Sequence, residues 1–122
     1  MKRFLGLGLA VLLAGCGKPT TAWLDQLHAP DAASRLHAIK ALGDRPSEAP
    51  LAVPALAQVL SDQDAFVRRD AAEALGRFGT DARPAVPALL TRLRDRQRMV
   101  RRAAAHALVK IDPEIAAKAK VP

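Results

Sequence analysis

Apolar and small residues recur along the chain at helical spacing and, above that, at a longer period of 33 residues. One series comprises Ala38, Ala41 and Leu42, then Ala71, Ala74 and Leu75, then Ala104, Ala107 and Leu108. A second series keeps the same step and comprises Trp23, Leu56 and Leu89, with Leu27, Leu60 and Leu93 one helical turn later. A fixed period of this length is typical of helix pairs that stack and bury a continuous core.

The same pattern predicts where the helices begin and end. We expect helices at 21–28, 31–42, 51–60, 64–77, 84–94, 97–110 and 114–120, with a loop at 44–50. Asp31 and Asp112 stand where a carboxylate can cap a helix start. Gly43 is expected to end the helix at 31–42, and the helix at 64–77 is expected to end around Gly76 and Gly79. Pro54 is placed in a first helical turn, where no intrahelical N–H bond is lost.

These elements divide into a half repeat at 20–30, repeats at 31–63 and 64–96, and a partial repeat at 97–122. In this register Trp23 is expected in the core of the first layer. The alternative is that Trp23 anchors the protein at a membrane interface, a zone that tryptophan favours.

The second copy of the pattern resembles a known repeat. Residues 64–76 match the D-x-x-V-R-x-x-A-A-x-A-L-G signature of bacterial HEAT repeats through Asp64, Val67, Arg68, Ala71, Ala72, Ala74, Leu75 and Gly76. The resemblance implies an all-α fold, a short α-solenoid of stacked hairpins that winds as a right-handed superhelix. The third copy departs from the signature, with Gln97 in place of the aspartate and Val109 in place of the glycine. Some relatives of this repeat class are phycobilin lyases or their accessory proteins, but the repeat itself carries no catalytic residues.

The first 16 residues are organised like a secretory signal. Lys2 and Arg3 precede an uncharged apolar run at 4–14, which is too short to span a bilayer. The run ends in Leu-Ala-Gly-Cys at 13–16, which resembles a bacterial lipobox. The resemblance implies that 1–15 is removed, that Cys16 is lipidated, and that 16–19 is a short tether. The alternative is an ordinary signal peptide with a chance cysteine.

Lipidation at Cys16 predicts a bacterial cell-envelope protein, lipid-anchored and facing the periplasm. Gly17, and not aspartate, follows the cysteine, and this resemblance to known sorting patterns favours the outer membrane over the inner membrane. Loss of Lys2 and Arg3 with the signal lowers the formal charge from +7 by two, to +5.

Composition restricts the chemistry further. The single cysteine allows no intramolecular disulfide. His28, His37 and His106 occupy unrelated repeat positions, and no metal-binding spacing of His, Cys or acidic residues occurs. We therefore predict no catalytic residues, no metal and no cofactor, and a protein that is not an enzyme.

Arg35, Arg68 and Arg101 fall at equivalent repeat positions. The first two follow Asp31 and Asp64 by four residues, a spacing that allows an ion pair on a helix surface. We expect these pairs to belong to a structural ladder that joins the repeats.

The arginine patch is the strongest surface feature of the sequence, and consists of Arg92, Arg94, Arg96, Arg98, Arg101 and Arg102. It suits an acidic protein segment, a lipid phosphate or a glycan, since arginine binds carboxylate and phosphate in a bidentate manner. The alternative is a solvated basic edge. Nucleic acid is disfavoured by the expected compartment, and no aromatic residues alternate with the arginines.

A second candidate surface is a groove along the shorter helices, lined by Ala52, Ala55, Gln58, Ala85, Ala88 and Thr91. The alternative is that these residues are small only to let neighbouring helices pack.

The sequence thus predicts a membrane-anchored, non-catalytic adaptor that binds a protein partner with an acidic segment. The alternatives are an accessory or lyase-like subunit that resembles bilin-processing HEAT proteins, and a structural protein that self-associates. The oligomeric state stays open.

Overall fold

The computed structural model describes residues 17–121, so Cys16 and the predicted signal at 1–15 lie outside the described residues. The described part contains seven α-helices and two 3-10 helices and no strand. They are α2 (Thr20–Gln26), α3 (Ala32–Gly43), η1 (Pro46–Glu48), α4 (Ala49–Val59), α5 (Ala65–Arg77), η2 (Gly79–Ala85), α6 (Val86–Arg92), α7 (Arg98–Ile111) and α8 (Pro113–Lys118). Among these residues, every helix is too short or too polar to cross a bilayer.

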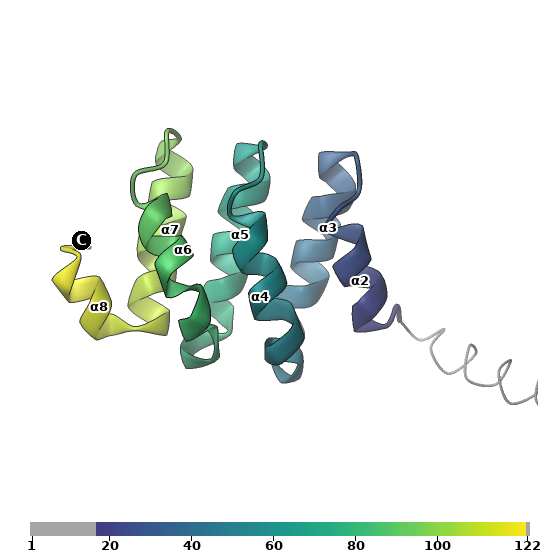
Figure 1. The fold of residues 1–122 in the computed structure, drawn as a ribbon, viewed down its shortest axis with the longest axis horizontal. Coiled ribbons are helices and arrows are strands. Elements are labelled where there is room, and N and C mark those ends of the chain that lie inside the picture. Colours follow the sequence, from purple (N-terminus) through teal and green to yellow (C-terminus); the bar gives the residue numbers. More distant parts are fainter. Residues whose placement is uncertain (1–16, 122) are drawn as a thin grey trace, which may run out of the picture.

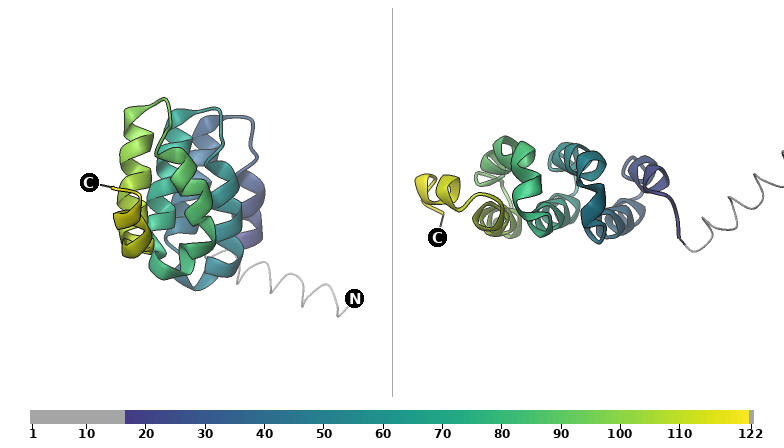
Figure 2. Two further views of the ribbon diagram at one scale, coloured as in Figure 1. Left: turned by 60° about the vertical axis from the view of Figure 1, so that its left-hand side comes forward. Right: turned by 90° about the horizontal axis from the view of Figure 1, so that it is seen from below.

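The helices form two parallel rows. Helices α3, α5 and α7 lie side by side in one row, and α2, α4 and α6 cover them in the other, with α8 beyond α7 at the C-terminal end (Figure 1, Figure 2). The core runs between the rows from Trp23 to Ala116 without interruption. The predicted all-α solenoid is therefore confirmed.

The 33-residue register places equivalent residues in equivalent surroundings. Trp23, Leu56 and Leu89 are all buried between the rows. Leu27, Leu60 and Leu93 each follow the last residue of α2, α4 and α6, with nearly the same backbone angles. Burial of a side chain of this size contributes about 1.5–3 kcal/mol, so each layer adds a similar stabilisation.

Trp23 belongs to the core, as the register predicts. The edge of its ring faces His37 at a centroid distance of 5.0 Å, and Lys18 Nζ lies 4.7 Å from the ring centroid. With the tryptophan buried in the first layer, an anchoring role at a membrane interface does not fit.

Aspartate side chains start three of the helices. Asp31 accepts from the Ser34 N–H, Asp64 from the Phe66 and Val67 N–H groups, and Asp112 from the Ile115 N–H. These bonds satisfy donors that have no partner inside the helix. Gln97, at the matching position before α7, makes no side-chain cap, which agrees with its departure from the repeat signature.

The predicted glycine positions agree with the structure. Helix α3 ends at Gly43, and α5 ends at Arg77, between Gly76 and Gly79, with Gly79 at a positive φ of 58°. A Cβ on Gly43 would lie 3.1 Å from Ala74 Cβ, and one on Gly76 would lie 3.2 Å from Ala107 Cα. The glycines are there because the next helix of the row approaches closely. Val109 takes the matching position in α7, where it is exposed, and no further described helix of that row follows.

Two boundaries also differ from prediction. Helix α4 begins at Ala49, and η1 occupies part of the predicted loop at 44–50. Pro54 therefore lies in the helix interior, and Pro50 takes the first-turn position that suits proline. In the next repeat η2 runs through Ala85, so α6 starts later than predicted and Pro87 lies in its first turn.

Candidate functional site

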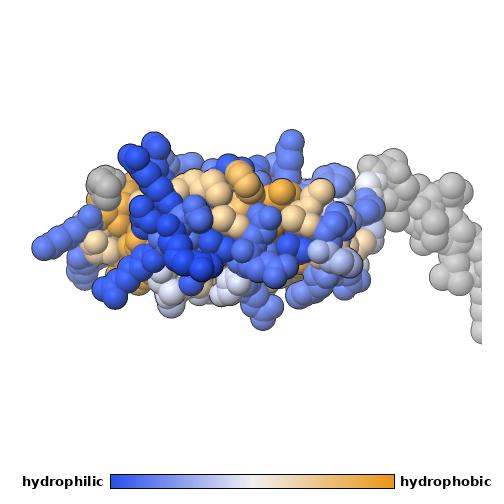
Figure 3. Space-filling view, turned by 90° about the horizontal axis from the view of Figure 1, so that it is seen from above, coloured by the Kyte–Doolittle hydropathy of each residue, from blue (hydrophilic) through white to orange (hydrophobic). Residues whose placement is uncertain are grey.

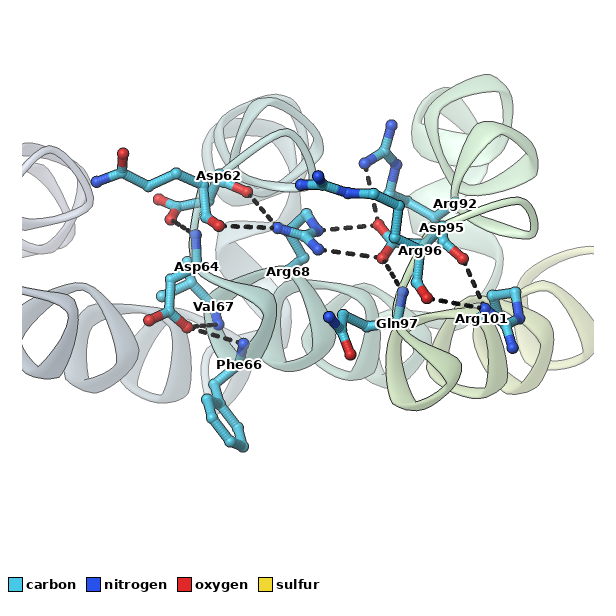
Figure 4. A network of polar contacts seen from close by, with 11 residues as sticks. Asp62, Asp64, Phe66, Val67, Arg68, Arg92, Asp95, Arg96, Gln97 and Arg101 are labelled. Atoms are coloured by element: carbon cyan, nitrogen blue, oxygen red, sulfur yellow. Dashed lines mark hydrogen bonds and ion pairs between the residues drawn. The ribbon is translucent and has the colours of Figure 1, made fainter.

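The arginine ladder (Arg35, Arg68 and Arg101) joins each repeat to the turn before the next repeat. Arg68 donates through Nε and Nη2 to the two carboxylate oxygens of Asp95, at 2.9 and 3.1 Å. Its Nη1 donates to the carbonyls of Asp62 and Gln63. Figure 4 shows the guanidinium held between the α4–α5 turn and the α6–α7 turn. This bidentate arrangement fixes the spacing of the two turns.

Arg35 makes the same contacts one repeat earlier. Its Nη1 donates to the carbonyls of Ala29 and Pro30, and its Nη2 donates to Asp62 Oδ1 at 3.2 Å. Its Nε lies 3.0 Å from Asp62 Oδ2, but the N–H is not aligned for a hydrogen bond. The first pair is thus looser than the second.

The predicted ladder is present, but its partners are not those predicted. Asp31 and Asp64 cap helices, and in the described residues neither forms an ion pair with the arginine four residues later. The carboxylates used are Asp62 and Asp95, each 27 residues after its arginine. The sequence did contain this signal, because Asp62 and Asp95 share the 33-residue period.

Asp95 is the most heavily used carboxylate of the site. Besides Arg68 it accepts from Arg92 Nη1 at 3.1 Å and from the Gln97 N–H at 2.9 Å. Burial alone would raise the pKa of Asp95, but the hydrogen bonds from Arg68 and Gln97 and the charges of Arg68 and Arg92 hold that pKa below its ordinary value. Asp95 therefore stays ionised, and the α6–α7 turn is held rigidly around it.

Arg101 has only half of the ladder contacts. Its Nη1 donates to the carbonyls of Asp95 and Arg96, as the other two arginines do in their own turns. Within residues 17–121, its Nε and Nη2 make no hydrogen bond or ion pair. Arg35 and Arg68 are buried, whereas Arg101 is half-buried.

The structure divides the six-residue arginine patch into two groups. Arg92 and Arg101 are half-buried and bind within the fold, to Asp95 and to the backbone of the turn. Arg94, Arg96, Arg98 and Arg102 are exposed on the α6–α7 turn and the first turns of α7. Viewed from above, hydrophilic side chains gather over this C-terminal end of the stack (Figure 3).

A cavity of about 810 Å³ opens beside these arginines. Its wall comes from the α4–α5 turn, the α6–α7 turn and Ala119 after α8, and includes Asp62, Arg68, Leu93 and Arg96. Both charged and aliphatic groups line it. The arrangement can hold an acidic group against arginine while an apolar side chain rests on leucine.

The predicted groove is wrong in part. Ala52 and Ala85 are fully buried, because each lies one helical turn before Leu56 or Leu89 and shares their inward face. Ala55 and Ala88 are half-buried, and Gln58 and Thr91 are exposed. For the two buried alanines, the packing alternative is the correct one.

The three histidines are exposed and lie on different helices or turns. In the described residues no group of three His, Cys, Asp or Glu side chains could hold a metal ion.

Comparison with known proteins agrees with this geometry. The family model for HEAT repeats matches residues 20–108, which is most of the chain. The chain belongs to the HEAT-repeat family. A chain in "The structure of the complex of CpcE and CpcF of phycocyanin lyase from Nostoc sp. PCC7120" is similar to this HEAT-repeat protein, with 32% identity and a TM-score of 0.75. The match covers 84% of this chain and 41% of that one, so this chain spans about two fifths of the neighbour's length. No curated protein matches it in sequence.

Proposed function

We propose that this HEAT-repeat protein is a non-catalytic adaptor that binds an acidic segment of another protein through the arginine patch. One observation carries the proposal. Arg94, Arg96, Arg98 and Arg102 are exposed, and within residues 17–121 they form no ion pair; Arg94 and Arg96 also line the cavity. The planar guanidinium of arginine is pre-organised for bidentate binding of a carboxylate, so less conformational freedom is lost for each hydrogen bond that forms.

We further propose that lipidation of Cys16 anchors the protein to the bacterial envelope on the periplasmic side, with the outer membrane favoured. Helix α2 begins at Thr20, so three residues separate the anchor from the fold. Such a tether reaches about 10 Å at most. The arginine patch lies at the opposite end of the stack from α2 (Figure 1), which favours a protein partner over the anchoring bilayer itself.

A pull-down from membranes tests the adaptor. The triple variant Arg96→Glu/Arg98→Glu/Arg102→Glu reverses the exposed patch, and we expect it to lose the partners that the wild type recovers. The variant Lys40→Glu/Arg83→Glu/Lys118→Glu makes the same change of charge at exposed positions outside the patch, and should keep them. Equal recovery by all three proteins rejects the patch as a binding surface.

A second candidate is an accessory or lyase-like subunit. The similarity to a chain of the CpcE–CpcF complex, at 32% identity over most of this chain, supports it. That role requires a cytoplasmic protein. Metabolic labelling with a palmitate analogue separates the two candidates, with Cys16→Ser as the control. Label that depends on Cys16 supports the anchored adaptor, and an unlabelled protein that retains residues 1–15 favours the lyase-like role.

A further inference from the structure

Among residues 17–121, Arg101 has no carboxylate at the place where Arg35 and Arg68 each have one. Nη1 of Arg35 and of Arg68 donates to two carbonyls in the turn before the arginine's own helix. Their Nε and Nη2 atoms face one carboxylate in the turn before the next repeat. Arg101 makes the Nη1 contacts, so its guanidinium is held in the same orientation. Its Nε–Nη2 edge has no acceptor within residues 17–121 (Figure 4).

A second residue at this end is also incompletely covered. Leu27 and Leu60 are buried, with 3% and 1% of their surface exposed, because the following layer packs on them. Leu93 takes the matching position at the end of α6 and is half-exposed, and it lines the cavity together with Ala119. Within residues 17–121, Arg101 and Leu93 therefore both lack the neighbour that covers the equivalent residues of the earlier layers.

The repeat geometry defines that neighbour. In both complete layers a leucine follows the last residue of α4 or α6, and the carboxylate comes two residues after that leucine. The two sequences are Leu60-Ser61-Asp62 and Leu93-Arg94-Asp95. We infer that a partner protein supplies a helix ending in Leu-x-Asp, whose carboxylate binds Arg101 and whose apolar face covers Leu93. This inference rests on the adaptor proposal and narrows its acidic segment to one motif.

A second copy of the chain fits this place poorly. In head-to-tail stacking, the first layer of a second copy would face Arg101. In that layer Ala29 takes the register position of Asp62 and Asp95, and alanine has no carboxylate. In tail-to-tail contact the exposed Arg94, Arg96, Arg98 and Arg102 would face their own copies and repel one another. The charge of this end thus favours a different, acidic partner.

A helical peptide provides a direct probe. Residues 53–63 of the chain itself end in Leu60-Ser61-Asp62 and one further residue, and carry the Leu-x-Asp ending of a complete repeat. A staple between positions 54 and 58, both exposed in α4, keeps so short a peptide helical. We expect it to bind the full-length protein in detergent, and the Asp62→Asn peptide to bind roughly tenfold more weakly because the charge-assisted hydrogen bonds are lost.

The matched protein variants are Arg101→Lys and Arg83→Lys. Lysine at 101 keeps the positive charge and can donate to the turn carbonyls, but it lacks the two-pronged edge, so binding should weaken by a similar factor. Arg83 is exposed and lies outside both the ladder and the arginine patch, so its lysine variant should bind like the wild type. In NMR spectra the Arg101 Nε–H signal should move when the peptide with the native aspartate is added, and move less at the same concentration of the Asp62→Asn peptide.

The inference is overturned if the two peptides bind equally, if neither binds, or if Arg83→Lys weakens binding as much as Arg101→Lys. Concentration-dependent self-association that disappears in Arg101→Lys would assign the site to a second copy instead, and also overturns it. None of these results decides whether the protein is an adaptor, because the pull-down with the triple glutamate variant tests that separately. Unchanged circular dichroism of both lysine variants shows that the fold is retained.

Discussion

The two junctions between repeats follow one register but differ in tightness. The first junction sets α3 against α5, and the second sets α5 against α7. At the first, Asp62 keeps 14% of its side chain exposed and accepts from Arg35 and one N–H. At the second, Asp95 keeps 2% exposed and accepts from Arg68, Arg92 and one N–H. The second junction therefore depends more heavily on its carboxylate.

The glycines show a close approach at both junctions. A Cβ on Gly43 would meet the side chain of Arg77, which can move away, and the Ala74 Cβ, which cannot. A Cβ on Gly76 would meet the Ala107 Cα, which is backbone. Helix α5 contacts α7 more extensively than it contacts α3. This second junction adjoins the turn that presents the arginine patch, so a closely packed base supports the proposed binding surface.

The largest expected effect is loss of the Asp95 carboxylate. Asp95→Ala leaves the buried Arg68 without its partner, and the free energy of unfolding should fall by about 3–5 kcal/mol. Asp62→Ala removes a more exposed and less aligned pair, and should cost clearly less. Urea unfolding of both variants measures the difference. Equal losses would show that the two junctions contribute alike, and the comparison would fail.

A valine at Gly76 tests the close approach of α5 and α7. Gly76→Val should lower the free energy of unfolding by about 1–3 kcal/mol, because overpacking against the Ala107 backbone forces the helices apart. Gly43→Val should cost a similar amount, because Arg77 can turn aside but the Ala74 Cβ cannot. Val109→Gly is the reverse change at the matching exposed position and should cost only about 1 kcal/mol or less, through helix propensity. Thermal unfolding followed by circular dichroism ranks the three variants.

These two tests also separate what the sequence could predict from what it could not. The 33-residue period predicts the layers and the buried leucines, because burial depends on position in the repeat. The spacing rule for a single helix predicts Asp31 as the partner of Arg35 and Asp64 as the partner of Arg68. The structure uses Asp62 and Asp95, which are distant in sequence and adjacent only when repeats stack. The close contact at Gly76 likewise comes from the next repeat, through the backbone of Ala107.

Acid sensitivity distinguishes the junctions without changing their packing. The pKa of Asp95 is lower in the folded chain than in the unfolded chain, through Arg68, Gln97 and Arg92 in spite of burial. A carboxylate with a lowered pKa stabilises the fold above its unfolded pKa, near pH 4, and this contribution is lost as pH falls through the folded pKa.

Urea unfolding at a series of pH values from 6 downward should therefore show a stability loss that is smaller in Asp95→Asn than in the wild type. Asp44→Asn carries the same change of charge in an exposed pair and serves as the control. If Asp95→Asn loses stability with acid as steeply as the wild type, Asp95 is not the carboxylate responsible.

The smallest expected effect on stability is at the C-terminal ends of α3, α5 and α7, opposite the arginine ladder. At the first junction Asp44 pairs with Arg77 at 2.8 Å, with about half of each side chain exposed. One repeat later the matching residues are Arg77 and Lys110, two like charges that line one shallow cavity. Lys110→Glu should convert this contact into an ion pair and raise the free energy of unfolding by less than about 1 kcal/mol, since exposed pairs contribute little.

Salt tests the origin of that gain. Because the charges are exposed, the difference between Lys110→Glu and the wild type should shrink toward zero at about 1 M salt, whereas the cost of Asp95→Ala should persist, because the Arg68 pair is buried. A gain that survives high salt would come from packing or helix propensity. A loss in Lys110→Glu would mean that Glu73, which lines the same cavity, outweighs Arg77, and that the tighter second junction does not extend to this end of the helices.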